Sequence, residues 1–188
     1  MITNKDDLRR YLEEDKNALQ ISRNKPKFLG DEIWRFQIAL RKHEYYNNQI
    51  TNKLLELAWV VRIYKTILCH YWHVKHKILG VLLGFSIPIH TIEEGLCIYH
   101  YGSIVIGRNA KIGKRCSIHN NVNIGQHHSL KETPVIGDDC YIGPGAKLFG
   151  NIILGNNVSI GANAVVNKSF DEDNIVLVGI PAKIIKYK

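Results

Sequence analysis

Paired cysteines, an apolar leader segment and long uncharged apolar runs are all missing from this 188-residue sequence. The four cysteines, Cys69, Cys97, Cys116 and Cys140, form no CxxC pair, so their spacing does not favour a zinc ribbon or a redox dithiol. Charged residues recur throughout residues 5–16. We therefore expect no cleavable signal peptide and a cytoplasmic location.

The most apolar region, residues 54–85, is interrupted by Arg62, Lys65, Lys75 and Lys77. It lacks the run of roughly 20 apolar residues that a membrane-spanning helix needs. The region is therefore predicted to be a packed helix. The sequence does not decide whether the basic part of this region contacts a membrane surface.

Basic residues outnumber acidic ones, with 25 Lys and Arg against 17 Asp and Glu and a formal net charge of +8. This balance favours anionic partners such as phosphorylated cofactors, without choosing among them. The content of 45% hydrophobic and 22% charged residues is ordinary for a soluble globular protein, so we expect a mainly folded chain.

An aliphatic residue recurs every six positions from residue 106 onward: Ile106, Ile112, Ile118, Ile124, Ile136, Ile142, Leu148, Leu154, Ile160 and Val166. Glycine usually follows it directly, and a small residue usually follows four positions later. This period predicts a parallel β solenoid, in which the aliphatic side chain points inward and the glycine permits a tight turn. An amphipathic helix, with its period of 3.6 residues, does not fit.

The six-residue pattern is interrupted once, between Ile124 and Ile136, where polar residues predict a projecting loop. Before the repeats, apolar residues recur at helix-like intervals and predict about four helices. We therefore expect a helical N-terminal subdomain over residues 1–84. The solenoid domain, with a short C-terminal tail, would occupy residues 85–188.

Three segments, IHNNVNIG, IGPGAKLFGNIILGNNVSIGANAVV and VGIPAKI, resemble the serine acetyltransferase family of hexapeptide-repeat acyltransferases. The resemblance covers residues 85–186. The short helical part and the FSIPIH segment look more like the branch of surface-polysaccharide O-acetyltransferases. The resemblance implies a mainly β fold, a left-handed parallel β-helix with an α-helical N-terminal subdomain. It also implies acetyl transfer from acetyl-CoA to a hydroxyl, without a metal or nucleic acid, at a site between the subunits of a homotrimer.

His100 stands where the family's general base precedes the first regular repeat. An alcohol hydroxyl is a weak nucleophile at neutral pH, so a neutral imidazole has to take its proton during attack on the thioester. The resemblance therefore makes His100 the predicted catalytic residue.

Two departures from the family concern the acceptor. Tyr99 replaces the aspartate that precedes the catalytic histidine, and Glu132 and Thr133 replace an Arg-His pair that holds the carboxylate of serine. A carboxylate needs a cation, which Glu132 does not provide. We therefore predict a sugar acceptor from a surface-polysaccharide precursor, with Tyr99 and Tyr101 offering flat faces and hydroxyls. L-Serine is the alternative acceptor.

Three further histidines are candidates for the acceptor site. His119 lies one coil after the predicted base and would neighbour it in the acceptor pocket or at the trimer seam. His127 and His128 lie in the interrupted stretch, where either could take the place of the missing loop histidine.

The resemblance places CoA along the late coils, where small residues let the pantetheine arm lie on the solenoid surface and basic residues attract the phosphates. The predicted CoA-binding residues are Gly143, Pro144, Gly161, Ala162, Asn167, Lys168, Lys183 and Lys186.

Two other functions share this type of repeat. The γ-type carbonic anhydrases bind zinc through three histidines across a subunit boundary, but the close HxxxxH pair that they require is missing here. A non-catalytic trimeric protein could keep the solenoid for assembly alone, although His100 at the position of the base argues against this.

Overall fold

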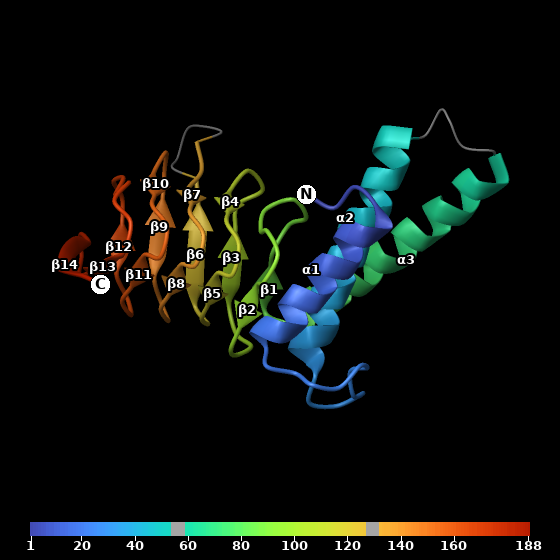
Figure 1. Cartoon of the computed structure of the whole chain (residues 1–188), viewed down its shortest axis with the longest axis horizontal. Coiled ribbons are helices and arrows are strands. Elements are labelled where there is room, and N and C mark those ends of the chain that lie inside the picture. Colours follow the sequence, from blue (N-terminus) through green and yellow to red (C-terminus); the bar gives the residue numbers. More distant parts are fainter. Residues whose placement is uncertain (54–58, 127–131) are drawn as a thin grey trace.

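The computed structural model describes residues 1–53, 59–126 and 132–188. Within these ranges the N-terminal part contains three helices where about four were expected: α1 (Lys5–Ala18), α2 (Glu32–Lys53) and α3 (Trp59–Leu83). The helices gather at one end of a stack of short strands, and the C-terminus lies at the other end (Figure 1). None of the described helices is both long and apolar enough to cross a membrane.

The strands form three sheets that run along the stack. The first sheet holds β1 (Phe85–Ser86), β3 (Ile104–Ile106), β6 (Val122–Gly125), β9 (Lys147–Phe149) and β12 (Val165–Val166). The second holds β4 (Lys111–Ile112), β7 (Val135–Ile136) and β10 (Ile153–Leu154). The third holds β2 (Cys97–Ile98), β5 (Ser117–Ile118), β8 (Tyr141–Ile142), β11 (Ser159–Ile160), β13 (Ile175–Val178) and β14 (Lys183–Tyr187).

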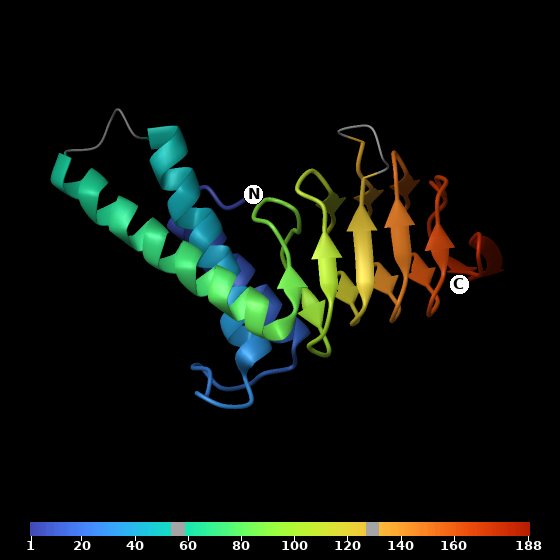
Figure 2. The same ribbon diagram turned by 180° about the vertical axis from the view of Figure 1, so that it is seen from behind.

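From β2 to β12, consecutive strands belong to different sheets, so the chain winds through all three sheets in the successive coils (Figure 2). All strand pairs are parallel except the last, β13 with β14. The ten aliphatic residues of the six-residue series are each at most 2% exposed. The predicted hexapeptide solenoid and its inward aliphatic columns are therefore confirmed.

The repeat glycines have a different role from the one expected. At the corner after β7, the residue in the left-handed region is Asp139, with φ of 58°, and not Gly137. A Cβ on Gly137 would instead lie 2.5 Å from the carbonyl oxygen of Gly155 on the next coil. Glycine is thus needed there because neighbouring coils approach closely, and the residue two positions later makes the turn.

The helices and the solenoid share one hydrophobic core, to which α2 contributes Phe36 and Leu40, and α3 contributes Leu79 and Leu83. A buried ion pair lies at the same junction, where Arg41 Nε donates to Asp15 Oδ2 over 2.8 Å. Asp15 Oδ1 also accepts the backbone N–H groups of residues 95 and 96, each at 2.9 Å. The start of the solenoid is therefore held by the helices through both apolar and ionic contacts.

Candidate active site at the first corner of the solenoid

The corner that carries His100 is longer than the corners stacked on it. Ile98, Ile118 and Ile142 are paired across successive coils, as are Ile106, Ile124 and Leu148. The interval is eight residues in the first coil (106 − 98) and six in the next two (124 − 118 and 148 − 142). The two extra residues make Tyr99, His100 and Tyr101 project as exposed side chains.

The long corner is fixed to the end of α3. The backbone N–H of Gly102 donates to the carbonyl of Leu83 over 2.9 Å, and a Cβ on Gly84 would lie 3.0 Å from the carbonyl carbon of Gly102. The close approach of two glycines thus ties the position of His100 to the helical part. No local sequence pattern could have indicated this contact.

His119 joins the corner from the next coil. Its ring stacks on Tyr99 with centroids 4.5 Å apart, lies 6.3 Å from the ring of His100 and meets Tyr141 edge-on at 5.1 Å. Burial lowers the pKa of His119, and the neighbouring charge of His100 lowers it further. Two imidazoles and two phenols therefore share one face, and the structure brings Tyr99, His100 and His119 together.

A hollow of about 340 Å³ separates His100 from the helical part. The exposed corner lines one side, and the start of α2 lines the other with Asp31, Glu32 and Trp34. Burial of Asp31 opposes its ionisation, but the ion pair with Arg23 and the N–H of residue 27 together lower its pKa. This side of His100 is thus acidic. Sequence spacing could not identify Asp31 and Glu32, which lie nearly seventy residues before the histidine.

A second hollow, of about 270 Å³, lies beside Tyr99 and is lined by Glu14, Cys97, Arg115 and Ser117. The guanidinium of Arg115 binds the carboxylate of Asp139 through Nε and Nη2, each over 2.6 Å. Its hydrogen bonds with Asp139 are the main cause that raises its pKa. Arg115 is the only cation lining either hollow among the described residues.

A row of side-by-side residues leads from the corner along the solenoid. We call it the corner row: Tyr99, His119, Gly143, Gly161 and Val178, each directly after a paired strand residue in the third sheet. At roughly 4.8 Å per coil, the row extends about 19 Å from Tyr99 to Val178. The described structure thus places Gly143 and Gly161 in one row with Tyr99, the neighbour of the predicted base.

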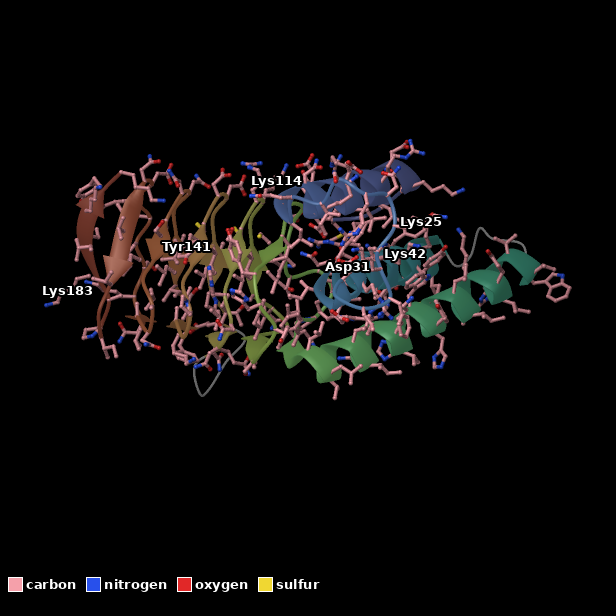
Figure 3. All side chains as sticks on the ribbon, turned by 90° about the horizontal axis from the view of Figure 1, so that it is seen from below. Lys25, Asp31, Lys42, Lys114, Tyr141 and Lys183 are labelled. Carbon is pink, nitrogen blue, oxygen red and sulfur yellow. The ribbon has the colours of Figure 1, made fainter. Side chains whose placement is uncertain are left out.

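The predicted basic residues divide between two corners. Lys183 pairs with Val178 and so ends the corner row, at the far end of the solenoid from Asp31 (Figure 3). Lys186 pairs with Val176 on the same strand. Pro144 and Ala162 follow Gly143 and Gly161 on the row's corner.

Asn167 and Lys168 follow β12 and therefore belong to the next corner, after the first sheet. Lys168 there lies over the ring of Phe170, 5.2 Å from its centroid. The interrupted stretch begins at the same corner, after β6. The predicted acceptor residues His127 and His128 lie outside the described residues.

The two residues that replace the family's Arg-His pair are described. Glu132 is exposed, while Thr133 is buried, with its methyl group 3.6 Å from the place where a Cβ on Gly107 would lie. Thr133 thus packs against the solenoid. As for a metal, no group of three or more His, Cys, Asp or Glu side chains able to hold one occurs in the described part of the chain.

Comparison with known proteins identifies the repeat. Residues 133–168 match the family described as bacterial transferase hexapeptide (six repeats). A serine acetyltransferase of Staphylococcus aureus is 30% identical over 185 residues, which cover 97% of this chain and 77% of that protein. The serine acetyltransferase of Buchnera aphidicola (Schizaphis graminum) is 36% identical over 132 residues, covering 63% of this chain and 50% of the relative. The chain thus spans about half the length of some curated relatives that it matches.

Solved structures agree on the fold. A serine acetyltransferase from Brucella abortus superposes with a TM-score of 0.68 at 23% identity, covering 98% of this chain and 71% of that one. Soybean serine acetyltransferase complexed with serine gives 0.69 at 22% identity, covering 96% and 70%.

The prediction of a sugar acceptor, and of the polysaccharide branch, is wrong, because the curated relatives are serine acetyltransferases. That prediction relied on Glu132 and Thr133, although a cation for a carboxylate can come from another element, such as the corner that carries Arg115. With 30% identity over nearly its whole length to a relative of which it covers 77%, the chain belongs to the serine acetyltransferase family.

Proposed function

We propose that this protein transfers the acetyl group of acetyl-CoA to the hydroxyl of L-serine, with His100 as the general base. The observation that carries the proposal is the position of His100. It projects from the long corner beside His119, next to Tyr99 at the start of the corner row and next to a hollow lined by Asp31 and Glu32.

The imidazole of His100 would take the proton of the serine hydroxyl as the oxygen attacks the thioester carbonyl carbon. The bond between that carbon and sulfur then breaks, and the proton goes to the leaving thiolate. A side chain that titrates near neutral pH suits both steps. Tyr99, which stacks on His119, would hold the second imidazole in place beside the base.

L-Serine carries a carboxylate and an ammonium, and both kinds of partner line the two hollows. Glu14 and Glu32 supply carboxylates for the ammonium, and Arg115 supplies the cation for the carboxylate. Arg115 uses Nε and Nη2 for Asp139, while its Nη1 makes no hydrogen bond with the described residues. This arrangement supports an acceptor with both charges.

For acetyl-CoA, the corner row supplies the binding surface. Gly143 is buried, whereas Pro144 and Gly161 are half-buried and Ala162 is exposed, so these three would contact the pantetheine arm. Lys183 would provide a cation for phosphate at the end of the row. When bound, acetyl-CoA supplies the activated acetyl group. Asn167, Lys168 and Lys186 lie off this row and would act only from another corner or from a neighbouring subunit.

Several finer features belong to the same proposal. The coils would wind in the left-handed sense of the family's solenoid, and the protein would act as a homotrimer. Residues 1–84 and 85–188 would be its two structural units, and the cytoplasm its location. The match to the hexapeptide family and to serine acetyltransferases supports these features.

The test measures thiol release from acetyl-CoA with L-serine. We expect His100→Ala to lower kcat by about 10²- to 10⁴-fold, as for loss of a general base. Lys111→Ala, an exposed change on β4, is the control and should leave kcat within twofold. Undiminished turnover by His100→Ala would reject the base. To test the acceptor, ethanolamine, which lacks the carboxylate, replaces serine, and an equal kcat/KM for the two would reject the serine assignment.

A further inference from the structure

Helix α3 presents an apolar face to solvent, away from the rest of the protein. Seven of its residues follow one another at alternating intervals of four and three, and each is between 39% and 83% exposed. We call them the α3 seam: Val60, Tyr64, Ile67, Tyr71, Val74, Ile78 and Val81. A groove of about 620 Å³ runs beside this seam and is bounded by Arg35 of α2.

The opposite face of α3 is already occupied. Trp72 packs against the shared core, Leu79 lies in it, and His76 is buried against His43 of α2, with their Nδ1 atoms 3.1 Å apart. The seam is therefore not the side by which α3 joins its own subunit. A helix that is apolar on both faces has a second partner in the assembled protein.

The spacing of the seam indicates what kind of partner covers it. Alternation of four and three keeps apolar side chains along one line over three heptads, about 32 Å of helix at ~1.5 Å per residue. This is the pattern by which one helix packs along another in a coiled coil. In heptad terms, Tyr64, Tyr71 and Ile78 occupy position a.

Position d of the same heptads is β-branched throughout: Val60, Ile67, Val74 and Val81. In parallel coiled coils, two-stranded packing favours leucine at d, and β-branched residues there favour three or four strands. The seam is thus suited to a bundle of more than two helices.

Charge is compatible with parallel packing of identical helices. Trp59–Leu83 contains no Asp or Glu, so any arrangement that places its lysines opposite each other is repulsive. In a parallel pair, residue g contacts residue e of the next heptad on the partner helix. Lys77 then meets Leu82 and His70 meets Lys75, so no two lysines face each other.

We propose that the α3 seam packs against the seams of two further copies of this chain, parallel and in register, as a three-helix coiled coil. The proposal goes beyond the acetyl-transfer function, because it assigns self-association to a helix outside the solenoid and does not depend on the acceptor.

An anionic membrane is the competing partner for an apolar helix without acidic residues. Two of the four Lys and Arg side chains of α3, however, turn toward the subunit's own residues. Lys65 Nζ donates to Gln49 over 2.9 Å, and Lys75 Nζ lies 5.0 Å from the ring centroid of Trp72. These cations are half-buried and poorly placed for lipid headgroups, so the structure favours a second copy over a membrane.

The test is site-specific cross-linking of the full chain. In a Cys69→Ser background, Ile67→Cys places one thiol in the seam, and Thr66→Cys places one at a neighbouring exposed position outside it. With a short bis-maleimide, we expect covalent dimers from Ile67→Cys, at least tenfold more than from Thr66→Cys. Absence of dimers, or equal yields from both variants, overturns the proposal.

Sedimentation of the same samples separates this proposal from the trimer expected of the family. A trimeric mass without cross-linking at residue 67 would reject the seam contact and leave both the trimer and the acetyl-transfer proposal standing. The last measurement is binding of the protein to vesicles of phosphatidylglycerol. Vesicle binding that Ile67→Glu abolishes, without cross-linking in solution, would reject self-association and assign the seam to a membrane.

Discussion

The solenoid and the helical part are held together by different kinds of contact. In the solenoid, inward residues one coil apart, such as Ile106, Ile124 and Leu148, form apolar columns, and each coil contacts only its neighbours. At the junction with the helices, buried charged and polar groups make the specific contacts: Arg41 binds Asp15 and the carbonyls of Ile92 and Glu93, and Gln37 binds the carbonyl of Leu96.

This difference bears on the active site. The corner with His100 belongs to the solenoid by sequence, yet its position depends on the junction, because residues 92–96 lead into it and α3 anchors it from the other side. A substitution in the helical part should therefore lower activity more than a substitution in a distant coil that lowers the free energy of unfolding by the same amount.

The largest effect is expected from the buried ion pair. Arg41→Met leaves the carboxylate of Asp15 buried without its cation, and should lower the free energy of unfolding by about 3–5 kcal/mol. Urea denaturation followed by circular dichroism measures the loss. Glu13→Ala, which removes the exposed partner of a surface ion pair with Lys16, is the control and should cost no more than about 1 kcal/mol. Equal losses in the two variants would contradict the assigned role of the junction.

A smaller loss is expected within the solenoid. Ile142 is fully buried between neighbouring coils, so Ile142→Ala should cost about 3 kcal/mol through lost burial and a residual cavity. Ile153, half-exposed on β10, provides a matched control, and Ile153→Ala should stay within about 0.5 kcal/mol. Chemical denaturation compares the two. If Ile153→Ala proved as costly as Ile142→Ala, the apolar columns would not explain the stability of the coils.

The smallest effect concerns pH. Burial, helped by neighbouring positive charges, lowers the pKa of His43 to about 4 and that of His76 to about 3, both from 6.5. His73, Lys77 and His90 face this pair, and Glu44 opposes the shift of His43. Since the unfolded state binds more protons below pH 6.5, stability should fall as the pH falls from there toward 4.

Between pH 7 and 5.5 we expect a loss of about 2 kcal/mol, measured by urea denaturation at each pH. His43→Asn should remove about half of this pH dependence, because one of the two buried imidazoles is gone. An unchanged pH dependence in the variant would show that other groups cause it.

The prediction of the solenoid succeeded because its information is local. Each inward position, such as Ile118, is recognised from its neighbours six residues away, and the same rule repeats through the coils. The prediction for the glycines was right about their positions and wrong about their role. Glycine is needed at residue 137 because the next coil lies close to it, and not because of its own turn.

The acceptor was predicted wrongly for a related reason. Glu132 and Thr133 were compared with a family motif at one place in the chain, whereas the charges near His100 come from several places. Glu14, Asp31 and Arg115 reach the two hollows from α1, from the start of α2 and from another corner. Contacts across such sequence distances leave no periodic signal.

The sequence was sufficient for the repeat and its inward residues, because regular stacking makes both a matter of spacing. The candidate base came from the resemblance to a family and remains a prediction. The sequence could not reveal the eight-residue corner, the two charged hollows beside Tyr99 or the outward direction of the α3 seam. These features depend on how the helices pack against the first coil. Segments far apart in the chain make those contacts through buried charges and close backbone approach, and only the folded chain brings them together.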